Sequence, residues 1–256
     1  MLAFFICFGK PLADGVVRSV SVEGTAFMVE LNDGRILRTN DLVDTEFDIQ
    51  ISSKAMRLRI DSVERDSNAT DIWLHGFSVK QSNGAWKKLC KPGPDGRSLG
   101  FPLAGKSRRN GTLDTSYQNE FELACTSGVQ AKCLRYGYLP WSSAPDGSSL
   151  LQAFNACVLM LRADYSGDNT PTTRDGTKID IADRWNIQTL NADDDRFEAG
   201  WDAGGAVCVH HARISENMPL EALEASVPRL KGRTGGICTP EFAKQHGALI
   251  FNRSKR

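Results

Sequence analysis

The chain is organised around the stretch Leu161-Arg162-Ala163-Asp164-Tyr165-Ser166-Gly167-Asp168-Asn169. An apolar helical pattern leads into this stretch, and frequent Asp, Asn and Gly residues follow it as far as Asp183. Gly permits backbone conformations with positive φ, and Asp and Asn side chains accept hydrogen bonds from nearby backbone N–H groups. We therefore predict an ordered, irregular loop over residues 162–183, which we call the Asp-rich loop.

The Asp-rich loop has residue types that could perform hydrolysis. Carboxylates act as general acids and bases, an arginine holds an anionic substrate, and a serine becomes a nucleophile when a histidine takes its proton. His210 and His211 are the candidate bases, although the run around Ser166 is not the Gly-x-Ser-x-Gly turn of α/β-hydrolases. The candidate catalytic residues are Arg162, Asp164, Ser166, Asp168 and Asp175.

Two other interpretations use the same side chains. Asp164, Asp168 and Asn169 are candidate calcium ligands because calcium binds oxygen atoms, but their spacing is not that of an EF-hand. Alternatively, the aspartates cap turns and helix ends and pair with nearby arginines, namely Arg162, Arg174 and Arg184. We expect this structural role, with no metal and no cofactor. Adjacent histidines on a strand point to opposite faces, so we expect no metal shared by His210 and His211.

Helical and strand patterns alternate on both sides of the loop. Residues 149–161 have apolar positions at helical spacing, and residues 197–209 have the pattern of a hairpin with a Gly-rich turn. Thr239 followed by Pro240 is a typical helix start. Further expected elements are a strand at 121–125 and helices at 127–135 and 220–225.

The first ninety residues have the period-two pattern of short antiparallel strands. Asp33-Gly34 and Asn83-Gly84 are strong hairpin signals between such strands. This pattern predicts a small barrel or sandwich. His75 lies alone on one strand, where we expect a structural role. The Gly- and Pro-rich segment 91–118 is the expected domain boundary, between a β-rich domain at 16–105 and a mixed domain at 119–256.

Composition limits the function classes. The 256 residues include 41% hydrophobic side chains, enough to bury a sizeable core. Lys plus Arg equals Asp plus Glu at 31 each, so a nucleic-acid partner contacted through a broad basic face is not expected. The sequence has no apolar run long enough for a transmembrane helix.

The cysteines indicate an oxidising compartment. Cys7 lies in the apolar block 2–8, which resembles part of a secretion signal but lacks its basic region. We interpret residues 1–15 as a signal remnant, with a first strand as the alternative. The remaining six cysteines do not have zinc-site spacing, so we expect three disulfides. Many connectivities are open, and chain order and locality suggest the pairs Cys90–Cys125, Cys133–Cys157 and Cys208–Cys238.

A series of ordered motifs resembles the ADYC-domain family, bacterial proteins expected to be secreted and named after an Ala-Asp-Tyr-Cys tetrapeptide. The resemblance runs from about residue 30 to about residue 240. The matching motifs are Ala131-Lys132-Cys133, Gly137-Tyr138-Leu139-Pro140-Trp141, Ala156-Cys157, Arg162-Ala163-Asp164-Tyr165, Gly167-Asp168, Thr173-Arg174-Asp175-Gly176-Thr177 and Ile179-Asp180. The resemblance implies an exported, cysteine-bearing protein and no established activity.

The sequence departs from the family pattern at two positions. Ser166 stands where the family tetrapeptide has Cys, and Val227 stands where family members carry a Cys before the Pro-Arg-Leu segment. Both differences fit the loss of one disulfide better than the loss of a catalytic thiol.

Together these observations predict an α+β protein with an N-terminal antiparallel β barrel or sandwich, followed by a disulfide-stapled mixed α/β half. The function we expect is that of a secreted, periplasmic or envelope-associated binding protein, with a cell-envelope partner and an unidentified ligand. The alternative is an extracellular hydrolase with its site at the Asp-rich loop.

Overall fold

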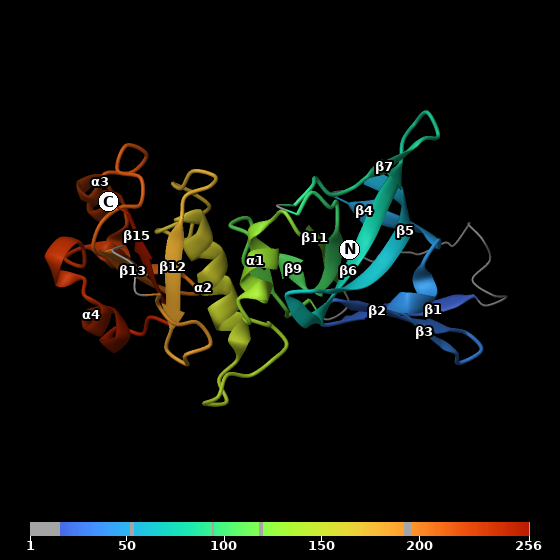
Figure 1. Ribbon diagram of the computed structural model, residues 1–256, viewed down its shortest axis with the longest axis horizontal. Coiled ribbons are helices and arrows are strands. Elements are labelled where there is room, and N and C mark those ends of the chain that lie inside the picture. The colour runs from blue at the N-terminus through green and yellow to red at the C-terminus, as the bar shows by residue number, and fades with distance from the viewer. Residues whose placement is uncertain (1–15, 52–53, 94, 118–119, 192–195, 256) are drawn as a thin grey trace. The chain divides into compact units, whose positions relative to one another are not determined.

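The computed structural model describes residues 16–51, 54–93, 95–117, 120–191 and 196–255 (Figure 1). The expected signal remnant at 1–15, with Cys7, lies outside the described residues. The chain forms two compact units. The N-terminal unit comprises the described residues up to Lys106 together with Asp114–Lys132, and the C-terminal unit comprises Ser107–Leu113 and Cys133–Arg256.

The N-terminal unit contains two antiparallel sheets. The smaller has the order β1-β2-β3, and the larger has the order β11-β8-β6-β5-β4, with β7 paired beside β6. The strands are β1 (Val17–Glu23), β2 (Ala26–Leu31), β3 (Ile36–Arg38), β4 (Glu46–Ile51), β5 (Lys54–Asp66), β6 (Ala69–Lys80), β7 (Trp86–Lys88), β8 (Gly100–Ala104) and β11 (Phe121–Cys125). A 3-10 turn, η1 (Thr39–Leu42), connects the sheets.

One hydrophobic core lies between these two sheets. Alternate residues of β2 are buried, as expected for a strand with one face in a core. They pack against alternate residues of β4, β5 and β6; the buried side chains are Phe27, Val29, Leu31, Leu42, Phe47, Leu58, Ile60, Phe77 and Val79. The unit is therefore a sandwich, one of the two arrangements expected. The turns at Gly34 and Gly84 have positive φ, in agreement with the hairpin signals.

The expected domain boundary requires a correction. Segment 91–118 contains β8, and β8 pairs along its length with β11, which the sequence suggested would belong to the second half. Four of the five β8 residues are buried, so the strand lacks the alternation that marks a half-exposed strand, and Pro102 and its Gly neighbours resemble a loop. The Cys90–Cys125 disulfide also closes within this unit, with a Cα–Cα distance of 5.5 Å.

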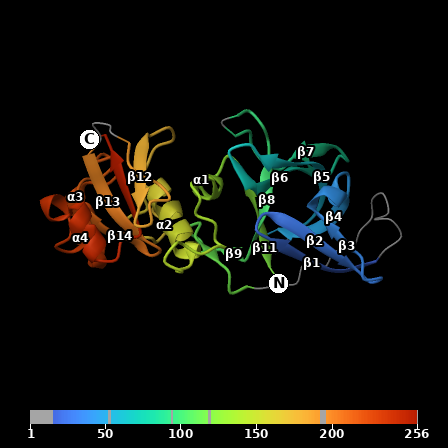
Figure 2. The same cartoon turned by 60° about the horizontal axis from the view of Figure 1, so that its bottom comes forward.

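The C-terminal unit has a four-stranded antiparallel sheet of order β12-β15-β13-β14. Its strands are β12 (Ile179–Asp183), β13 (Arg196–Asp202), β14 (Gly205–Val209) and β15 (Ile250–Ser254). Helices α2 (Leu150–Arg162) and α4 (Pro240–Gln245) lie on opposite sides of this sheet (Figures 1 and 2). Gly200 of β13 approaches Ala243 so closely that a Cβ atom would overlap it.

The remaining elements are short. Strands β9 (Lys106–Ser107) and β10 (Leu113–Asp114) pair where the chain passes between the units. The others are α1 (Val129–Arg135), α3 (Leu220–Ser226), and the 3-10 turns η2 (Pro228–Leu230) and η3 (Gly235–Ile237). The expected hairpin at 197–209 agrees with β13 and β14. The helices expected at 127–135, 149–161 and 220–225 agree with α1, α2 and α3. Thr239 caps α4 by accepting a hydrogen bond from the Phe242 N–H, as its Thr-Pro start predicts.

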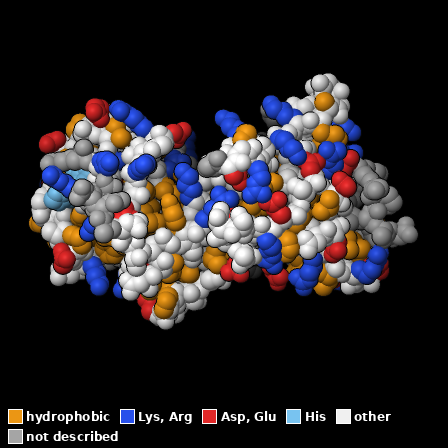
Figure 3. Space-filling model, in the orientation of Figure 1, with side chains coloured by type: hydrophobic (Ala, Val, Ile, Leu, Met, Phe, Trp, Pro, Cys, Tyr) orange, Lys and Arg blue, Asp and Glu red, His pale blue; other side chains and the backbone are white. Residues whose placement is uncertain are grey.

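Two disulfides staple the C-terminal unit. Cys133–Cys157 joins α1 to α2 with a Cα–Cα distance of 5.8 Å, and Cys208–Cys238 joins β14 to the segment after η3 at 5.5 Å. With Cys90–Cys125, the structure thus has the three pairs that order and locality suggested. No helix in the described part of the chain has the length and apolar character needed to cross a membrane. On the face drawn in Figure 3, basic and acidic side chains are interspersed, as their equal numbers in the sequence lead one to expect.

Candidate functional site

The Asp-rich loop begins with a tight reversal at the end of α2. Ala163 adopts a left-handed conformation with φ of 47°, and its N–H donates to the Met160 carbonyl at 3.0 Å. Asp164 follows and is completely buried. Its two carboxylate oxygens accept hydrogen bonds from the N–H groups of Gly167 and Asn169, each at 3.0 Å. Asp164 therefore holds the loop closed in the way that an aspartate caps a turn.

Tyr165 connects the loop to the sheet. Its hydroxyl donates to Glu198 Oε1 at 3.0 Å and accepts from the Arg213 N–H at 2.8 Å. Its ring stacks on Trp201 with a centroid distance of 5.1 Å. Burial, together with the nearby Glu198 carboxylate, raises the pKa of Tyr165 well above its ordinary value. The hydroxyl therefore remains protonated and available as a donor.

A buried ion pair lies beneath Tyr165. Arg213 donates to Glu198 through two nitrogens, each at 2.9 Å, and the two side chains are only 1% and 0% exposed. Arg213 Nη2 also donates to the Met160 carbonyl at 2.8 Å, at the end of α2. Both charges are thus paired and hydrogen-bonded away from solvent. This arrangement fastens α2 to β13 and leaves no access for a ligand.

The loop rests directly on the hairpin between β13 and β14. The Ala206 N–H donates to the Tyr165 carbonyl at 2.9 Å. Gly167 has a φ of 72°, and a Cβ atom there would overlap the Gly204 carbonyl oxygen. Only glycine suits both the positive φ and this close approach. The Ala-Asp-Tyr stretch and Gly167 are therefore a structural joint between α2 and the hairpin.

The family model of the ADYC domain matches residues 39–215. The chain belongs to the ADYC domain family. The match begins at η1 and ends just beyond Arg213, so it includes the whole joint described above, and it stops before Val227. It is shorter than the range of about 30 to 240 indicated by the motifs. No curated protein and no solved structure matches the chain.

In this ADYC domain, four of the five candidate catalytic residues are engaged in hydrogen bonds within the loop. Ser166 Oγ donates to Asp168 Oδ1 at 2.5 Å, and hydrogen bonds from Ser166 and Thr170 lower the pKa of Asp168. Arg162 Nη2 donates to Asn169 Oδ1 at 2.6 Å. Asp175 is exposed in a separate turn. None of the five candidates lines the three cavities that the structure describes around Phe27, Trp185 and Phe251.

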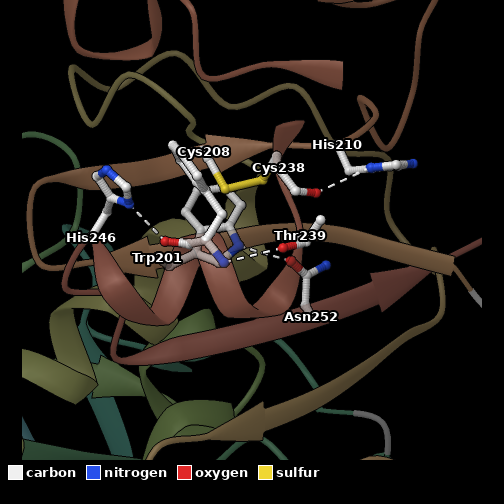
Figure 4. The surroundings of a disulfide bond; sticks show 8 residues. Trp201, Cys208, His210, Cys238, Thr239, His246 and Asn252 are labelled. Atoms are coloured by element: carbon white, nitrogen blue, oxygen red, sulfur yellow. Dashed lines mark hydrogen bonds between the residues drawn. A yellow bond between two sulfur atoms is a disulfide. The ribbon is translucent and has the colours of Figure 1, made fainter. Parts of the chain in front are cut away.

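The two adjacent histidines, His210 and His211, make their hydrogen-bond contacts away from Ser166. They follow the end of β14 instead of lying on a strand, which corrects the sequence expectation. His210 Nδ1 lies 3.1 Å from the Cys238 carbonyl oxygen, beside the disulfide (Figure 4). The His211 ring is buried, with Nε2 at 3.2 Å from Ser254 Oγ. These contacts hold both rings at the sheet, so the structure does not assemble a Ser–His pair.

The calcium candidates are also engaged within the loop. Asp164 directs both oxygens at N–H groups, and Asn169 Oδ1 already accepts from the cationic Arg162. The described residues contain no group of three or more His, Cys, Asp and Glu side chains placed to hold a metal ion. Asp183 has a similar capping role at the far end of the loop, where it accepts from the Tyr138 hydroxyl at 3.0 Å and from the Gln188 N–H at 2.6 Å.

A groove of about 440 Å³ in the C-terminal unit is the strongest candidate for a binding site. We call it the Trp185 groove. It lies within the size range of small-molecule sites in proteins. Its walls come from the start of α2, the turn after β12, the β13–β14 hairpin, η2 and the segment before β15. The lining residues are Asp146, Ser148, Ser149, Gln152, Arg184, Trp185, Asp202, Ala203, Gly204, Arg229, Gly247 and Leu249.

Hydrogen bonds and ion pairs fix the groove walls. Trp185 Nε1 donates to Asp146 Oδ2 at 2.8 Å, and Arg229 Nη2 donates to Asp202 Oδ2 at 2.6 Å. Hydrogen bonds from Ser148 and Trp185 lower the pKa of Asp146 to about 2, so its carboxylate is ionised at neutral pH. The Arg184 guanidinium carbon lies 5.8 Å from the centre of the Trp185 ring. The indole is half-buried, and the hydrogen bond holds it in one orientation.

The sequence interpretation did not identify this groove. Its residues come from five separated segments, so no local spacing links them. A signal in the sequence is Arg184-Trp185, a cation and a large aromatic side chain placed directly after the Asp-rich loop. A second hollow of about 290 Å³ lies on the sheet face next to α4 and is mainly apolar, with Leu190, Phe197 and Phe251 in its wall.

Proposed function

We propose that this ADYC-domain protein is a secreted or envelope-associated binding protein of bacteria, and that the Trp185 groove is its ligand site. The observation that supports this proposal is a contrast between two regions. The polar groups of the Asp-rich loop bond to one another, whereas the groove gathers Arg184, Trp185 and Gln152 around a concave space. Binding sites combine an apolar surface with a few polar groups that fix the ligand orientation.

The three disulfides support a location outside the cytoplasm. Such bonds form and persist in oxidising compartments and are rare where cellular reductants keep thiols reduced. A binding partner would then be a component of the cell envelope or a molecule in the surrounding medium.

Saturation-transfer NMR tests binding against hydrolysis. Three proteins are each mixed with sugars, amino acids, nucleotides and organic acids. They are the wild-type protein, a groove variant (Gln152→Ala with Arg184→Ala) and a loop variant (Ser166→Ala). We expect a compound class to receive saturation from the wild-type protein and the loop variant, and to lose it with the groove variant. Binding that is insensitive to the groove variant, or turnover that disappears in Ser166→Ala, would overturn the proposal and favour the hydrolase alternative.

A further inference from the structure

We infer that the ligand of the Trp185 groove is a neutral saccharide whose ring stacks on the Trp185 indole. This inference rests on the proposed function of the groove and adds the chemical class of the ligand. It is drawn from the orientation of the indole, the charges that line the groove and the kinds of polar group available there.

The indole is a preformed platform. Its Nε1–H is held by the ionised Asp146 at 2.8 Å, and Asp146 is itself held by the Ser148 hydroxyl and N–H. A tryptophan ring fixed before binding offers a large apolar face and loses little conformational entropy when a ligand covers it. The apolar face of a sugar ring matches such a surface, and Leu249 and Ala203 add further apolar lining.

The charges of the groove are balanced. Two arginines and two aspartates line it, and Arg229 is already paired with Asp202. Asp146 has its own hydrogen-bond donors, and Arg184 is near enough to contribute to its low pKa. Because Arg184 and Asp146 are near each other, a ligand with a net charge of either sign would be attracted by one of them and repelled by the other. The balance therefore favours a neutral ligand.

The polar groups suit hydroxyls. A carboxylate accepts hydrogen bonds, a guanidinium donates several in one plane, and the Gln152 amide does both. A sugar hydroxyl is both a donor and an acceptor, so it can bond to any of these groups without breaking an existing pair. Hydrogen bonds between hydroxyls and charged groups are stronger than those between neutral groups. The same set of side chains fits a polyhydroxylated ligand better than an extended apolar one.

Isothermal titration calorimetry with defined probes tests the inference. The neutral probes are cellobiose, maltose and N,N′-diacetylchitobiose; glucose 6-phosphate, glucuronate and glycylglycine are the comparison. We expect a neutral disaccharide to bind with little dependence on salt, because screening affects charged partners. Trp185→Ala should weaken this binding by about tenfold or more, because it removes both the aromatic contact and the apolar area that the ligand would cover.

Two further variants serve as controls. Trp141 is another tryptophan of the same unit, 42% exposed and outside the groove lining, so Trp141→Ala should leave the affinity unchanged. Trp185→Phe keeps a ring face and should retain part of the affinity, which separates loss of the platform from misfolding.

If only a charged probe or the dipeptide binds, and binding depends on Gln152 and Arg184, the saccharide class is wrong and the groove proposal stands. If no probe binds, or if binding is the same in all variants, the saccharide inference and the groove proposal are both overturned.

Discussion

Tyr165 shows how one residue of a short motif can hold several segments of a domain together. Its hydroxyl lies between Glu198 and Arg213, its carbonyl accepts from Ala206, and its ring covers Trp201. Each of these contacts joins segments that are far apart in the sequence. The two residues before Tyr165 shape the loop. Ala163 reverses the chain through its positive φ, and Asp164 accepts hydrogen bonds that close the loop. Side chains that are buried and fully bonded in this way stabilise the fold and cannot meet a ligand.

Glu198→Gln tests the importance of the buried pair. The substitution leaves Arg213 charged and without its full partner in a site that excludes water, which costs about 3–5 kcal/mol of unfolding free energy in comparable proteins. Glu216→Gln is the matched control in the same unit, because the Arg174–Glu216 pair is exposed and 3.8 Å long, and it should cost less than about 1 kcal/mol. Urea unfolding followed by tryptophan fluorescence measures both. Equal losses would contradict the account.

His75 should make the N-terminal unit sensitive to acid. Burial between Phe27 and Phe77 lowers the pKa of His75 to about 4, while the unfolded chain retains a value near 6.5. Below pH 6.5 the unfolded chain therefore binds a proton at His75, whereas the folded protein binds this proton only near pH 4. Stability falls through this window by about 3 kcal/mol. In His75→Gln, the loss of unfolding free energy between pH 7 and pH 4 should be smaller by that amount. An unchanged pH dependence would show that His75 does not titrate in this way.

At the scale of elements, the decisive contact is the one between the Asp-rich loop and the β13–β14 hairpin. The loop was expected from composition, and the hairpin from its strand pattern and Gly-rich turn. Their contact could not be predicted, because it depends on a backbone approach between Gly167 and Gly204, which are widely separated in sequence. Glu198 and Arg213 were missed for a similar reason. Each is a single charged residue without a local motif, and burial gives them their role.

Gly167→Ala should be far more damaging than Gly176→Ala. Both glycines lie in the Asp-rich loop with positive φ, at 72° and 83°, so alanine introduces a similar backbone strain of about 1–2 kcal/mol at either position. At Gly176 a Cβ atom has open space around it, whereas at Gly167 it would overlap the Gly204 carbonyl. The difference in melting temperature between the two variants therefore measures the docking of the loop. Identical melting temperatures would show that the loop and hairpin do not pack as described.

A fourth disulfide is expected from Ser166→Cys combined with Val227→Cys. Ser166 lies against Gly205, at the start of β14, and Val227 is buried just before η2, where Arg229 approaches Gly204. Ser166 thus contacts the hairpin directly, and η2, which begins directly after Val227, contacts β14. A bridge closing about sixty residues stabilises by about 4 kcal/mol on the chain-entropy estimate, less any strain. The double variant should have a higher melting temperature under oxidising conditions and no free thiol at either position, unlike the single variants. Two persistent free thiols would contradict the pairing.

At the scale of the whole molecule, the sequence predicted the class of fold more fully than the site. Local signals were sufficient for the hairpins at Gly34 and Gly84 and for α2. The three disulfides agree with the pairs that chain order and locality suggested among many open connectivities. The placement of β8 and β11 was missed because a strand buried on both faces has no alternation, and its partner is not adjacent in sequence. The Trp185 groove was missed because it exists only after five segments come together. A groove of this kind has no periodicity for sequence reasoning to detect.

The indole N–H signals in a nitrogen-15 correlation spectrum test the central claim most directly. The chain has five tryptophans, and Trp185→Phe and Trp141→Phe assign the two signals that matter. When a binding disaccharide is added, the Trp185 signal should shift in a saturable way, because its N–H donates to Asp146 in the groove wall. The Trp141 signal and the Gly167 and Asn169 amide signals, whose N–H groups Asp164 holds, should stay in place. A fixed Trp185 signal with shifts at Gly167 and Asn169 instead would place the site in the Asp-rich loop and contradict the account.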